Sequence, residues 1–396
     1  PPPGRCSPEQ ESNRQDQGTY TTGGAMTPFG RHTGVMAPEL AQAAILKAMN
    51  DAGVSAGDIQ AIYCANVLGG MILGQLVVRD LGFKGIPVYN VENACASGAT
   101  GVQLARHALL AQQYDTVLVS GIEQLTALGG GTIPLQRNDH KTELYAKAGM
   151  VLPAVYAMRG TRFLHERDAS PADLAAVAVK NRRNGSFNEF AQQRSETSVE
   201  EVLASRMIAD PLTLLQCCPS QVDGAAAVVL STRKGGAHKP VKVLSSVVVS
   251  GLREEAHDDI LDAEITARAA RQAYEQAGIG PEAVDVVELH DAFTIAELLY
   301  YEALGLAPRG EAVALLRSGA TQLGGRLPVN PSGGLLAKGH PLGATGVAQM
   351  VEIMWQLQER AGVRQVKGAR IGLTQCTGGG IAGVDHAASS VHLLGV

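Results

Sequence analysis

Cys95 is the first residue in this sequence whose surroundings suit catalysis. It lies in the segment ENACASGATG, at the predicted start of a helix, where unpaired N–H groups and the helix dipole favour a negative charge. Such a position lowers a thiol pKa from about 8.5 toward neutrality, as a thiolate nucleophile requires. The small residues beside Cys95 would leave room for a substrate. The alternative is a buried cysteine that only fills the core.

His340 is the second candidate, and it lies in NPSGGLLAKGHPLGATG between a glycine and a proline. A neutral imidazole at this position could accept the proton of a thiol and later donate a hydrogen bond to a thioester oxygen. Gly333, Gly334 and Gly339 would let the backbone approach a bulky ligand. The alternative is a loop histidine that is bonded to the backbone.

Cys376 is the third candidate, and it lies in QCTGGG directly after an apolar strand. A second thiol is useful if one cysteine attacks a substrate while the other moves protons. The glycines after Cys376 offer backbone N–H donors for an oxyanion. The alternative is a redox switch in which Cys95 and Cys376 form a disulfide.

The elements that must position these residues alternate between helix and strand. Helices are predicted at Pro38–Ala52 and Ala99–Gln113, and strands at Ile59–Ala65, Thr116–Ser120 and Ala225–Leu230, which indicates an α/β sheet covered by helices. The stretch between the last two strands is more polar, with helices predicted at Pro171–Arg183 and Ser198–Met207.

The predicted domains follow from this pattern. Residues 1–24 form a disordered segment, residues 25–120 with 217–235 form a first α/β half, residues 121–216 form an inserted loop or lid domain, and residues 241–396 form a second α/β half.

An internal repeat relates the two halves. The segment AMNDAGVSAGDIQAIY at 48–63 matches AYEQAGIGPEAVDVVE at 273–288, and GATGV occurs at 98–102 and again at 343–347. Cys95 lies three residues before the first GATGV, and His340 lies three residues before the second. A pseudo-twofold axis between duplicated halves would bring the two helix starts together. The repeat therefore predicts that Cys95 and His340 are neighbours.

Four motifs together, CASG, HDAF at 290–293, GHPLGATG and CTGGG, resemble the thiolase superfamily over nearly the whole chain from Met26. The HDAF block is similar to that of the sterol-carrier-protein-type branch, although no sterol-carrier domain follows it in this sequence. The resemblance implies a duplicated α/β fold of five layers, α-β-α-β-α, with an inserted loop domain, in a homodimer or tetramer.

The resemblance also implies a role for each candidate residue. Cys95 would be the acylated nucleophile, activated by His340, and Cys376 would be the acid and base at the α-carbon. His290 and His340 would help to form one oxyanion hole, and the N–H groups of Cys95 and Gly378 the other. The reaction would be cleavage of a 3-oxoacyl-CoA by free coenzyme A, or the reverse Claisen condensation. Coenzyme A is then a co-substrate, and neither a metal nor a bound cofactor is expected.

Two further expectations concern coenzyme A and the first strand. Lys180, Arg182 and Arg183 on a predicted helix could meet the phosphates of coenzyme A, although a solvated helix face is the alternative. The family begins with an apolar strand, whereas TYTTGGA stands at that position here, so this strand is predicted to be weak or absent.

The resemblance extends to possible partners and substrates. Some relatives of this branch, among them benzoylsuccinyl-CoA thiolases and steroid side-chain aldolases, work with a small subunit that carries an OB-fold and a zinc ribbon. A similar partner subunit is expected here, with a bulky, aromatic or branched 3-oxoacyl-CoA such as benzoylsuccinyl-CoA as the substrate.

Composition excludes several other classes. The net charge of −5 with no basic run argues against nucleic acid as a partner. The six cysteines form no CxxC pair, which argues against a disulfide framework and against a zinc ribbon in this chain. No apolar run reaches the length of a membrane span or signal peptide, so a cytoplasmic protein is expected.

Three rival functions stay open. A ketoacyl synthase shares the fold but does not need Cys376, and a retro-aldol lyase often dispenses with the cysteine at position 95. A non-catalytic lipid-binding or scaffold subunit would need none of the three candidates Cys95, His340 and Cys376.

Overall fold

The computed structural model describes residues 18–129, 140–251, 259–379 and 386–396. Nine of their strands form one continuous hydrogen-bonded order, which we describe as two sheets whose orders match except that β3 has no counterpart in the second. The first sheet runs β3 (Val88–Val91), β2 (Ala61–Ala65), β4 (Thr116–Gln124), β7 (Asp223–Ser231), β1 (Tyr20–Met26). The second runs β9 (Val286–Glu288), β10 (Ile371–Gly378), β11 (Ala388–Gly395), β8 (Val241–Ser250). A short β1–β8 pairing joins the two sheets at their edges.

The pairing directions repeat as well as the order. In the first sheet β2 and β4 are parallel, whereas β4 and β7 are antiparallel. In the second sheet β9 and β10 are parallel, whereas β10 and β11 are antiparallel. The duplication that the sequence predicts is therefore present in the topology.

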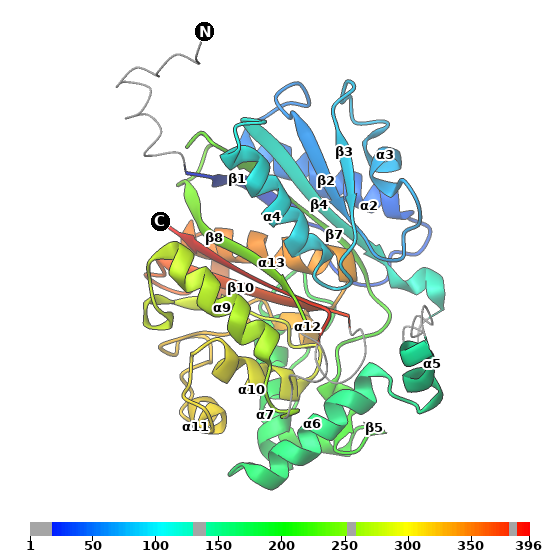
Figure 1. Ribbon diagram of the computed structural model, residues 1–396, viewed down its shortest axis with the longest axis vertical. Helices are drawn as coiled ribbons and strands as arrows, with labels where there is room; N and C mark the ends of the chain where they lie inside the picture. The colour runs from blue at the N-terminus through cyan, green and yellow to red at the C-terminus, as the bar shows by residue number, and fades with distance from the viewer. Residues whose placement is uncertain (1–17, 130–139, 252–258, 380–385) are drawn as a thin grey trace.

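Helices complete a five-layered arrangement. Helix α2 (Ala37–Ala52) packs on β1 and β7 of the first sheet, and α9 (Glu264–Ala277) packs on β8 and β11 of the second. Between the sheets lie α4 (Ser97–Leu110) and α13 (Leu342–Leu357), which contact each other, and α13 also contacts strands of both sheets (Figure 1). The predicted α-β-α-β-α fold is confirmed.

The two central helices meet at the glycines of the repeated motif. A Cβ added to Gly98 of α4 would lie 2.7 Å from the carbonyl oxygen of Gly343 and 3.0 Å from the amide nitrogen of Val347 in α13. A Cβ added to Gly346 of α13 would lie 2.9 Å from that of Ala99. Real Cβ atoms do not approach other atoms so closely, so this helix contact requires a glycine at position 98 in the first GATGV copy and at position 346 in the second.

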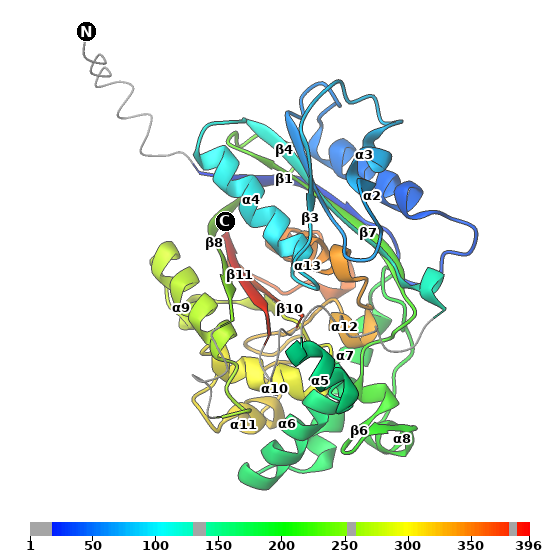
Figure 2. The same cartoon turned by 45° about the vertical axis from the view of Figure 1, so that its right-hand side comes forward.

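The insertion between β4 and β7 is mainly helical (Figure 2). It contains α5 (His140–Lys147), α6 (Leu152–Glu166), α7 (Pro171–Ser186), α8 (Val199–Ala204) and the short strands β5 (Met207–Ala209) and β6 (Leu212–Thr213). The helix predicted at Pro171–Arg183 is confirmed, whereas the one predicted at Ser198–Met207 ends at Ala204, and Met207 belongs to β5. β4 continues through Gln124, so residues 121–124 belong to the sheet. The other helices of the two halves are α3 (Leu73–Val78), α10 (Thr294–Ala303), α11 (Ala312–Arg317) and α12 (Gly334–Ala337).

The first strand corrects two predictions from the sequence. β1 is present and every residue in it is buried, so the segment before Met26 is ordered from at least Gly18, and the expected weak or missing strand is wrong. Residues 1–17 of the predicted disordered segment lie outside the described residues. The glycines of β1 serve close packing, because a Cβ on Gly23 would lie 2.6 Å from the Cα of Ala52 in α2. A strand can therefore be buried without an apolar run when a helix presses against its backbone.

Within the described residues, no helix is long and apolar enough to cross a membrane.

Candidate active site

A tight loop between β3 and α4 carries Cys95. Ala94 has a φ of 48°, which is unusual for a residue with a Cβ, and its N–H donates a 2.7 Å hydrogen bond to Glu92 Oε1. The N–H of Asn93 donates to Ser97 Oγ at 2.7 Å. Strand β10 presses on this loop, because a Cβ on Gly378 would lie 3.0 Å from the amide nitrogen of Ala96 and would also meet the carbonyl oxygen of Asn93.

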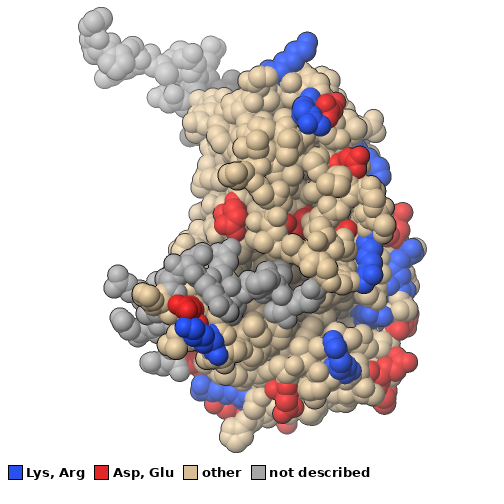
Figure 3. All heavy atoms as spheres, turned by 90° about the vertical axis from the view of Figure 1, so that its right-hand side faces the viewer, with Lys and Arg blue, Asp and Glu red and all other residues tan. Residues whose placement is uncertain are grey.

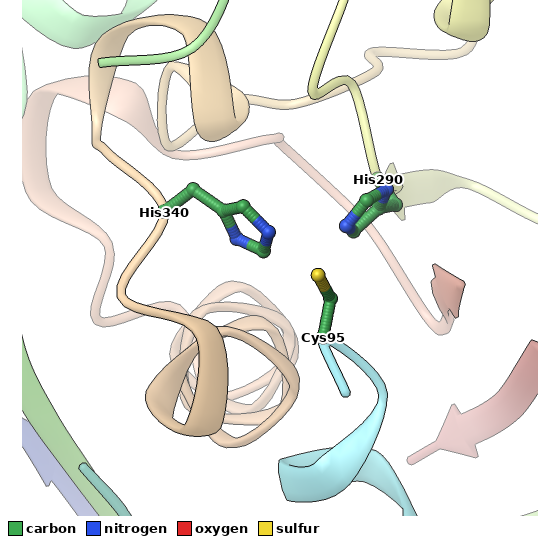
Figure 4. Close-up of side chains that lie close together, drawn as sticks. All are labelled: Cys95, His290 and His340. Atoms are coloured by element: carbon green, nitrogen blue, oxygen red, sulfur yellow. The ribbon is translucent and has the colours of Figure 1, made fainter. Parts of the chain in front are cut away.

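Cys95, His290 and His340 come together at the starts of the two central helices (Figure 4). The thiol sulfur and one ring nitrogen of each histidine all lie within 4.8 Å of one another. The two imidazole rings are 4.8 Å apart between centroids and nearly perpendicular, at 84°. The proximity of Cys95 and His340 that the duplication predicts is confirmed.

The hydrogen bonds of His340 fix which nitrogen carries its proton. Its Nδ1 lies 2.7 Å from Thr345 Oγ1, and the hydroxyl of Thr345 donates to the carbonyl oxygen of Pro341 at 3.0 Å. With the hydroxyl hydrogen on Pro341, Nδ1 is the donor to Thr345. The lone pair is then on Nε2, which is buried without a hydrogen-bond partner among the described residues. Burial lowers the pKa of His340 well below its usual range, so the imidazole is neutral and able to accept a proton.

His290 lies in the loop between β9 and α10, and strand β10 holds it. Its backbone N–H donates to Gln375 Oε1 at 3.0 Å, and its Nδ1 lies 3.1 Å from Thr377 Oγ1. Its Nε2, like that of His340, is buried and unpaired among the described residues. Burial, and then the neighbouring His386, lower the pKa of His290 to about 3.

Asp291 fixes the HDAF loop from the other side. Its carboxylate accepts the N–H of Leu335 at 2.7 Å and the side-chain amide of Asn181 at 2.7 Å. A carboxylate that caps the start of α12 in this way ties the His290 loop to the segment that leads to His340. Burial, followed by the charge of Glu297, raises the pKa of Asp291 to about 7.

The thiol of Cys95 is not the preformed thiolate that its helix position predicts. Burial raises its pKa to about 12, and backbone hydrogen bonds from Gly379 and from Cys95 itself oppose this only in part. The helix start has little effect because the N–H groups of Ala96 and Ser97 donate to the carbonyls of Asn93 and Ala94. The expectation of a lowered pKa is wrong, and activation of this thiol requires a base.

Cys376 lies inside β10, buried, with its thiol 3.1 Å from the carbonyl oxygen of Cys95. Burial, followed by the neighbouring Cys95, raises its pKa well above the usual range. The structure thus places the second thiol beside the first, as the sequence predicts. The sequence analysis assigned the backbone N–H of Gly378 to an oxyanion hole. In the structure, the N–H of the next residue, Gly379, donates a hydrogen bond to the thiol of Cys95.

The predicted contacts to coenzyme A need correction. Lys180 is buried, and its ammonium group pairs with Glu297 at 2.8 Å and donates to the carbonyl oxygen of Val329 at 2.8 Å. It therefore stabilises the interior and cannot reach a phosphate. Arg182 is half-buried and donates to the carbonyl oxygen of Ser195 at 2.9 Å, whereas Arg183 is exposed. Of the three, Arg183 keeps the accessibility that the prediction requires.

Several site residues escaped the sequence analysis. Thr345 had a signal, because it belongs to the repeated GATGV motif, and Thr377 follows Cys376 directly. Cys218 had no signal in the sequence. It is close enough to Cys95 for the charge of Cys95 to raise the pKa of its thiol. Its N–H donates to the carbonyl oxygen of Ala292 in HDAF at 2.8 Å.

The cluster of Cys95, His290 and His340 also has the donor atoms of a soft metal site. Among the described residues, no other group of three or more Cys, His, Asp or Glu side chains is close enough to hold an ion. The expectation that no metal takes part in catalysis stays a prediction.

Comparisons with known proteins agree with this geometry. The N-terminal domain of thiolase matches residues 19–234, and the thiolase C-terminal domain-like family matches residues 248–391. The chain is 42% identical to "Benzoylsuccinyl-CoA thiolase subunit BbsB" of Thauera aromatica, over 91% of this chain and 94% of the relative. It is 39% identical to an acetyl-CoA acetyltransferase of Methanothermobacter thermautotrophicus, over 90% and 95%. It is also 36% identical to human sterol carrier protein 2, over 89% and 68%.

Solved structures share the fold. The "Ltp2-ChsH2(DUF35) aldolase" superposes with a TM-score of 0.82 at 24% identity, covering 96% of this chain and 98% of that one. Human mitochondrial 3-ketoacyl-CoA thiolase superposes with a TM-score of 0.70 at 16% identity, covering 96% and 98%. The chain therefore belongs to the thiolase family and is an acyltransferase.

Proposed function

We propose that this enzyme is a thiolase that cleaves a 3-oxoacyl-CoA with free coenzyme A, or runs the reverse Claisen condensation, through an acyl group on Cys95. The observation that carries the proposal is the proximity of the Cys95 thiol to a neutral His340, whose ligand atoms lie within 4.8 Å of each other and whose Nε2 has no hydrogen-bond partner among the described residues. Cys376 beside Cys95 supplies the second proton-transfer group that carbon–carbon cleavage needs.

The first half-reaction forms the acyl-enzyme. The sulfur of Cys95 attacks the 3-oxo carbon while its proton passes to Nε2 of His340. The bond between the α-carbon and the 3-oxo carbon then breaks, and the electron pair becomes the enolate of the leaving CoA thioester. Cys376 gives its proton to the α-carbon of the enolate, and the resulting CoA thioester leaves while the rest of the substrate stays as an acyl group on Cys95. At this point Cys376 is a thiolate and His340 is an imidazolium.

The second half-reaction restores every proton. The Cys376 thiolate takes the proton of incoming coenzyme A, whose sulfur attacks the acyl group on Cys95. The tetrahedral intermediate expels the Cys95 sulfur, which recovers its proton from His340. The raised pKa of Cys95 fits this sequence, because attack and proton transfer are concerted and Cys95 does not have to be a thiolate beforehand.

Two sets of donors would stabilise the charges that develop. His290 and the protonated His340 face the position where the enolate oxygen would form. The N–H groups of Cys95 and Gly378 would receive the oxygen of the tetrahedral intermediate. The close approach of Gly378 to the loop of Cys95 supports the second assignment.

The test is direct acylation. The protein is incubated with a 3-oxoacyl-CoA, the reaction is stopped, and the mass of the peptide that contains Cys95 is measured by mass spectrometry. An acyl adduct is expected on Cys95, and it should disappear when free coenzyme A is added. Cys95→Ser should abolish the adduct, whereas Cys64→Ala, at a fully buried thiol in β2 away from the site, should keep it. No adduct on wild-type Cys95 would overturn the proposal.

The substrate that we propose is a bulky, aromatic or branched 3-oxoacyl-CoA such as benzoylsuccinyl-CoA. The relative from Thauera aromatica, at 42% identity over nearly its whole length, supports this class. A CoA-dependent cleavage assay across straight, branched, aromatic and steroid 3-oxoacyl-CoAs tests it. A clear preference for the straight chains would contradict it.

A retro-aldol lyase is the second candidate, favoured by the likeness to the aldolase structure. The two reactions differ in stoichiometry, because a thiolase consumes one coenzyme A for each bond cleaved and an aldolase consumes none. Cleavage that proceeds at full rate without free coenzyme A would favour the lyase.

We also propose that the chain forms a homodimer or a tetramer. β3 lies at the edge of the first sheet, and its residues Tyr89 and Asn90 are exposed. The neighbouring Met71 and Ile72 are 91% and 60% exposed, and Figure 3 shows a broad face with few charges on this side of the molecule. Pairing of two β3 strands would satisfy the free edge and cover this face. Light scattering should give a dimer or larger for the wild type and a monomer for Met71→Asp with Ile72→Asp.

A small partner subunit with an OB-fold and a zinc ribbon belongs to the same proposal. The name of the Thauera aromatica relative calls it a subunit, and the aldolase structure includes a DUF35 partner. Co-purification from the native host tests this, and a homodimer with full activity alone would contradict it. A cytoplasmic location also stays a prediction.

A further inference from the structure

Two buried imidazoles of the site each have a ring nitrogen without a hydrogen-bond partner. His290 and His340 are 3% and 5% exposed, and the Nε2 atom of each has no partner among the described residues. Leaving a buried polar atom unpaired costs about 1–3 kcal/mol. Both rings and the sulfur of Cys95 point into one space (Figure 4). The proposed reaction uses these atoms while substrate is bound, and the empty site offers them to any other ligand that fits the same geometry.

The three atoms are the donor set of a soft divalent cation. The Cys95 sulfur and one ring nitrogen of each histidine lie within 4.8 Å of one another. Sulfur and imidazole nitrogen are ligands of Zn²⁺, whereas Mg²⁺ and Ca²⁺ require oxygen ligands, which this group lacks. In a tetrahedral zinc site, bonds of about 2.0 Å to nitrogen and about 2.3 Å to sulfur place the ligand atoms about 3.3–3.6 Å apart. Movements of about 1 Å or less in each side chain would therefore close the group around an ion.

Each histidine already has an outer partner of the kind that metal ligands need. A ligating imidazole donates its other N–H to a neighbouring acceptor, which fixes the ring and keeps the lone pair on the side of the metal. Nδ1 of His340 lies 2.7 Å from Thr345 Oγ1, and Nδ1 of His290 lies 3.1 Å from Thr377 Oγ1. Either hydroxyl oxygen can accept an N–H. Both rings can therefore present the lone pair of Nε2 to one ion.

The loops that carry the two histidines are held in place without an ion. The backbone N–H of His290 donates to Gln375 Oε1 at 3.0 Å, and the carboxylate of Asp291 accepts a backbone N–H of α12, the helix just before His340. Cys95, in contrast, keeps part of its surface exposed, which leaves an approach from the side of the sulfur. The site is therefore largely preformed, and little ordering entropy opposes binding.

We propose that Cys95, His290 and His340 form an inhibitory site for Zn²⁺, in which the sulfur and both Nε2 atoms are ligands and water takes the fourth position. When the ion binds, the thiol of Cys95 releases its proton to the solvent and a sulfur–zinc bond forms, with no oxidation or reduction. The inhibition rests on the proposed function. A sulfur held by zinc is not free to attack a carbonyl carbon, and a coordinated His340 has no lone pair for a proton.

The first test measures metal binding without any substrate. Protein treated with a chelator is titrated with Co²⁺, a spectroscopic substitute for zinc. We expect one Co²⁺ per chain with a sulfur-to-metal charge-transfer band, complete displacement by Zn²⁺ and no effect of Mg²⁺. Cys95→Ala should lose the band. His290→Gln or His340→Gln should weaken binding by more than about 100-fold, because each removes a direct ligand.

Matched variants separate this site from other thiols, imidazoles and hydroxyls. Cys64→Ala and His392→Gln each remove a fully buried side chain of a type that binds zinc but lies outside the group, so both should keep the band. Thr345→Val should weaken binding by about 10- to 100-fold, because the imidazole of His340 loses its outer partner. Thr374→Val, at a buried threonine of β10 outside the group, should bind as the wild type does.

The second test joins metal binding to the reaction. Saturating Zn²⁺ should slow acylation of Cys95 by at least about 100-fold, since loss of the base alone has an effect of this size. A chelator should restore the rate, which shows that the inhibition is reversible. Protein that already carries an acyl group on Cys95 should give no charge-transfer band with Co²⁺, because the thiolate ligand is missing.

The outcomes separate the inference from the proposed function. A band that persists unchanged in Cys95→Ala would mean an adventitious ion only and would overturn the site. If Co²⁺ and Zn²⁺ bind through Cys95 but acylation keeps its rate in saturating Zn²⁺, the inhibitory role is wrong and the thiolase assignment stands. If wild-type Cys95 is never acylated in metal-free protein, the proposed function fails, while the Co²⁺ band still decides the metal site.

Discussion

The contact between the two central helices makes one strong prediction, which concerns Gly98 of α4. In Gly98→Ala, the new methyl group would lie 2.7 Å from the carbonyl oxygen of Gly343 and 3.0 Å from the amide nitrogen of Val347. Both are backbone atoms of α13 and cannot rotate away. The helices must separate by about 0.5–1 Å to restore ordinary contact.

The cost has two opposing parts. Overpacking of this kind destabilises by about 1–3 kcal/mol. Replacing glycine by alanine inside a helix stabilises the helix by at most about 1 kcal/mol. We therefore expect a net loss of about 1–2 kcal/mol in the free energy of unfolding. The larger effect is on catalysis, because Cys95 and His340 lie at the starts of these helices, and a displacement near 1 Å can cost about 100-fold in rate.

The same helix provides the control. A Cβ on Gly101, three residues along α4, would meet a methyl carbon of Val119 at 3.1 Å and makes no close contact with α13. Gly101→Ala should keep the acylation rate of Cys95, and its urea midpoint should stay near that of the wild type. Gly98→Ala should lower both the midpoint and the rate of acylation, measured by mass spectrometry of quenched samples. If the two variants behave alike, the helices do not meet at their backbones and the geometric reasoning fails.

Three further predictions address the base, the buried histidines and the buried lysine. His340→Ala should slow acylation of Cys95 by about 100- to 10,000-fold, as measured by quenched mass spectrometry, and a rate near that of the wild type would remove its role as base. Unfolding in urea should become easier as the pH falls from 7 to 5, because His290 and His386, with pKa values of about 3 and 4, stay neutral when folded but bind protons when unfolded. Each of them should lower the free energy of unfolding by about 2 kcal/mol between pH 7 and pH 5. A free energy of unfolding that does not change with pH would contradict the burial of both rings. Lys180→Met should destabilise the fold by about 3–5 kcal/mol in urea unfolding, because it leaves Glu297 buried without its partner, and the KM for coenzyme A should not change.

The sequence predicted the relation between Cys95 and His340 because duplication is a symmetry that can be read from matching segments. A pair of residues at equivalent positions must lie near the axis, whatever the rest of the fold does. The same reasoning could not predict the pKa of Cys95. The number of free N–H groups at a helix start depends on local turns, and here Ser97 and Ala96 donate to the loop before them.

Other features depend on contacts that no local pattern records. Lys180 lies close to Arg182 and Arg183 on a helix, and only the packing of α7 against the second half shows that it faces inward to Glu297. β1 has the composition of a loop, and only the approach of α2 explains its glycines. The contact of Tyr156 with His386 joins residues 230 positions apart, so a sequence without an alignment gives no signal for it.

The division of the site between the two halves also has a consequence for synthesis on the ribosome. The proposed nucleophile belongs to the first half, whereas its proposed base at position 340 and the second thiol at position 376 are synthesised more than 200 residues later. Strand β10 must insert beside the Cys95 loop before proton transfer is possible, because the Cys376 thiol contacts the carbonyl of Cys95 across 281 residues of chain. An incomplete nascent chain therefore holds a cysteine with no means of activation. If the proposed mechanism holds, reactivity toward thioesters appears only when β10 has folded beside the Cys95 loop, so activity itself reports that both halves have been made and assembled.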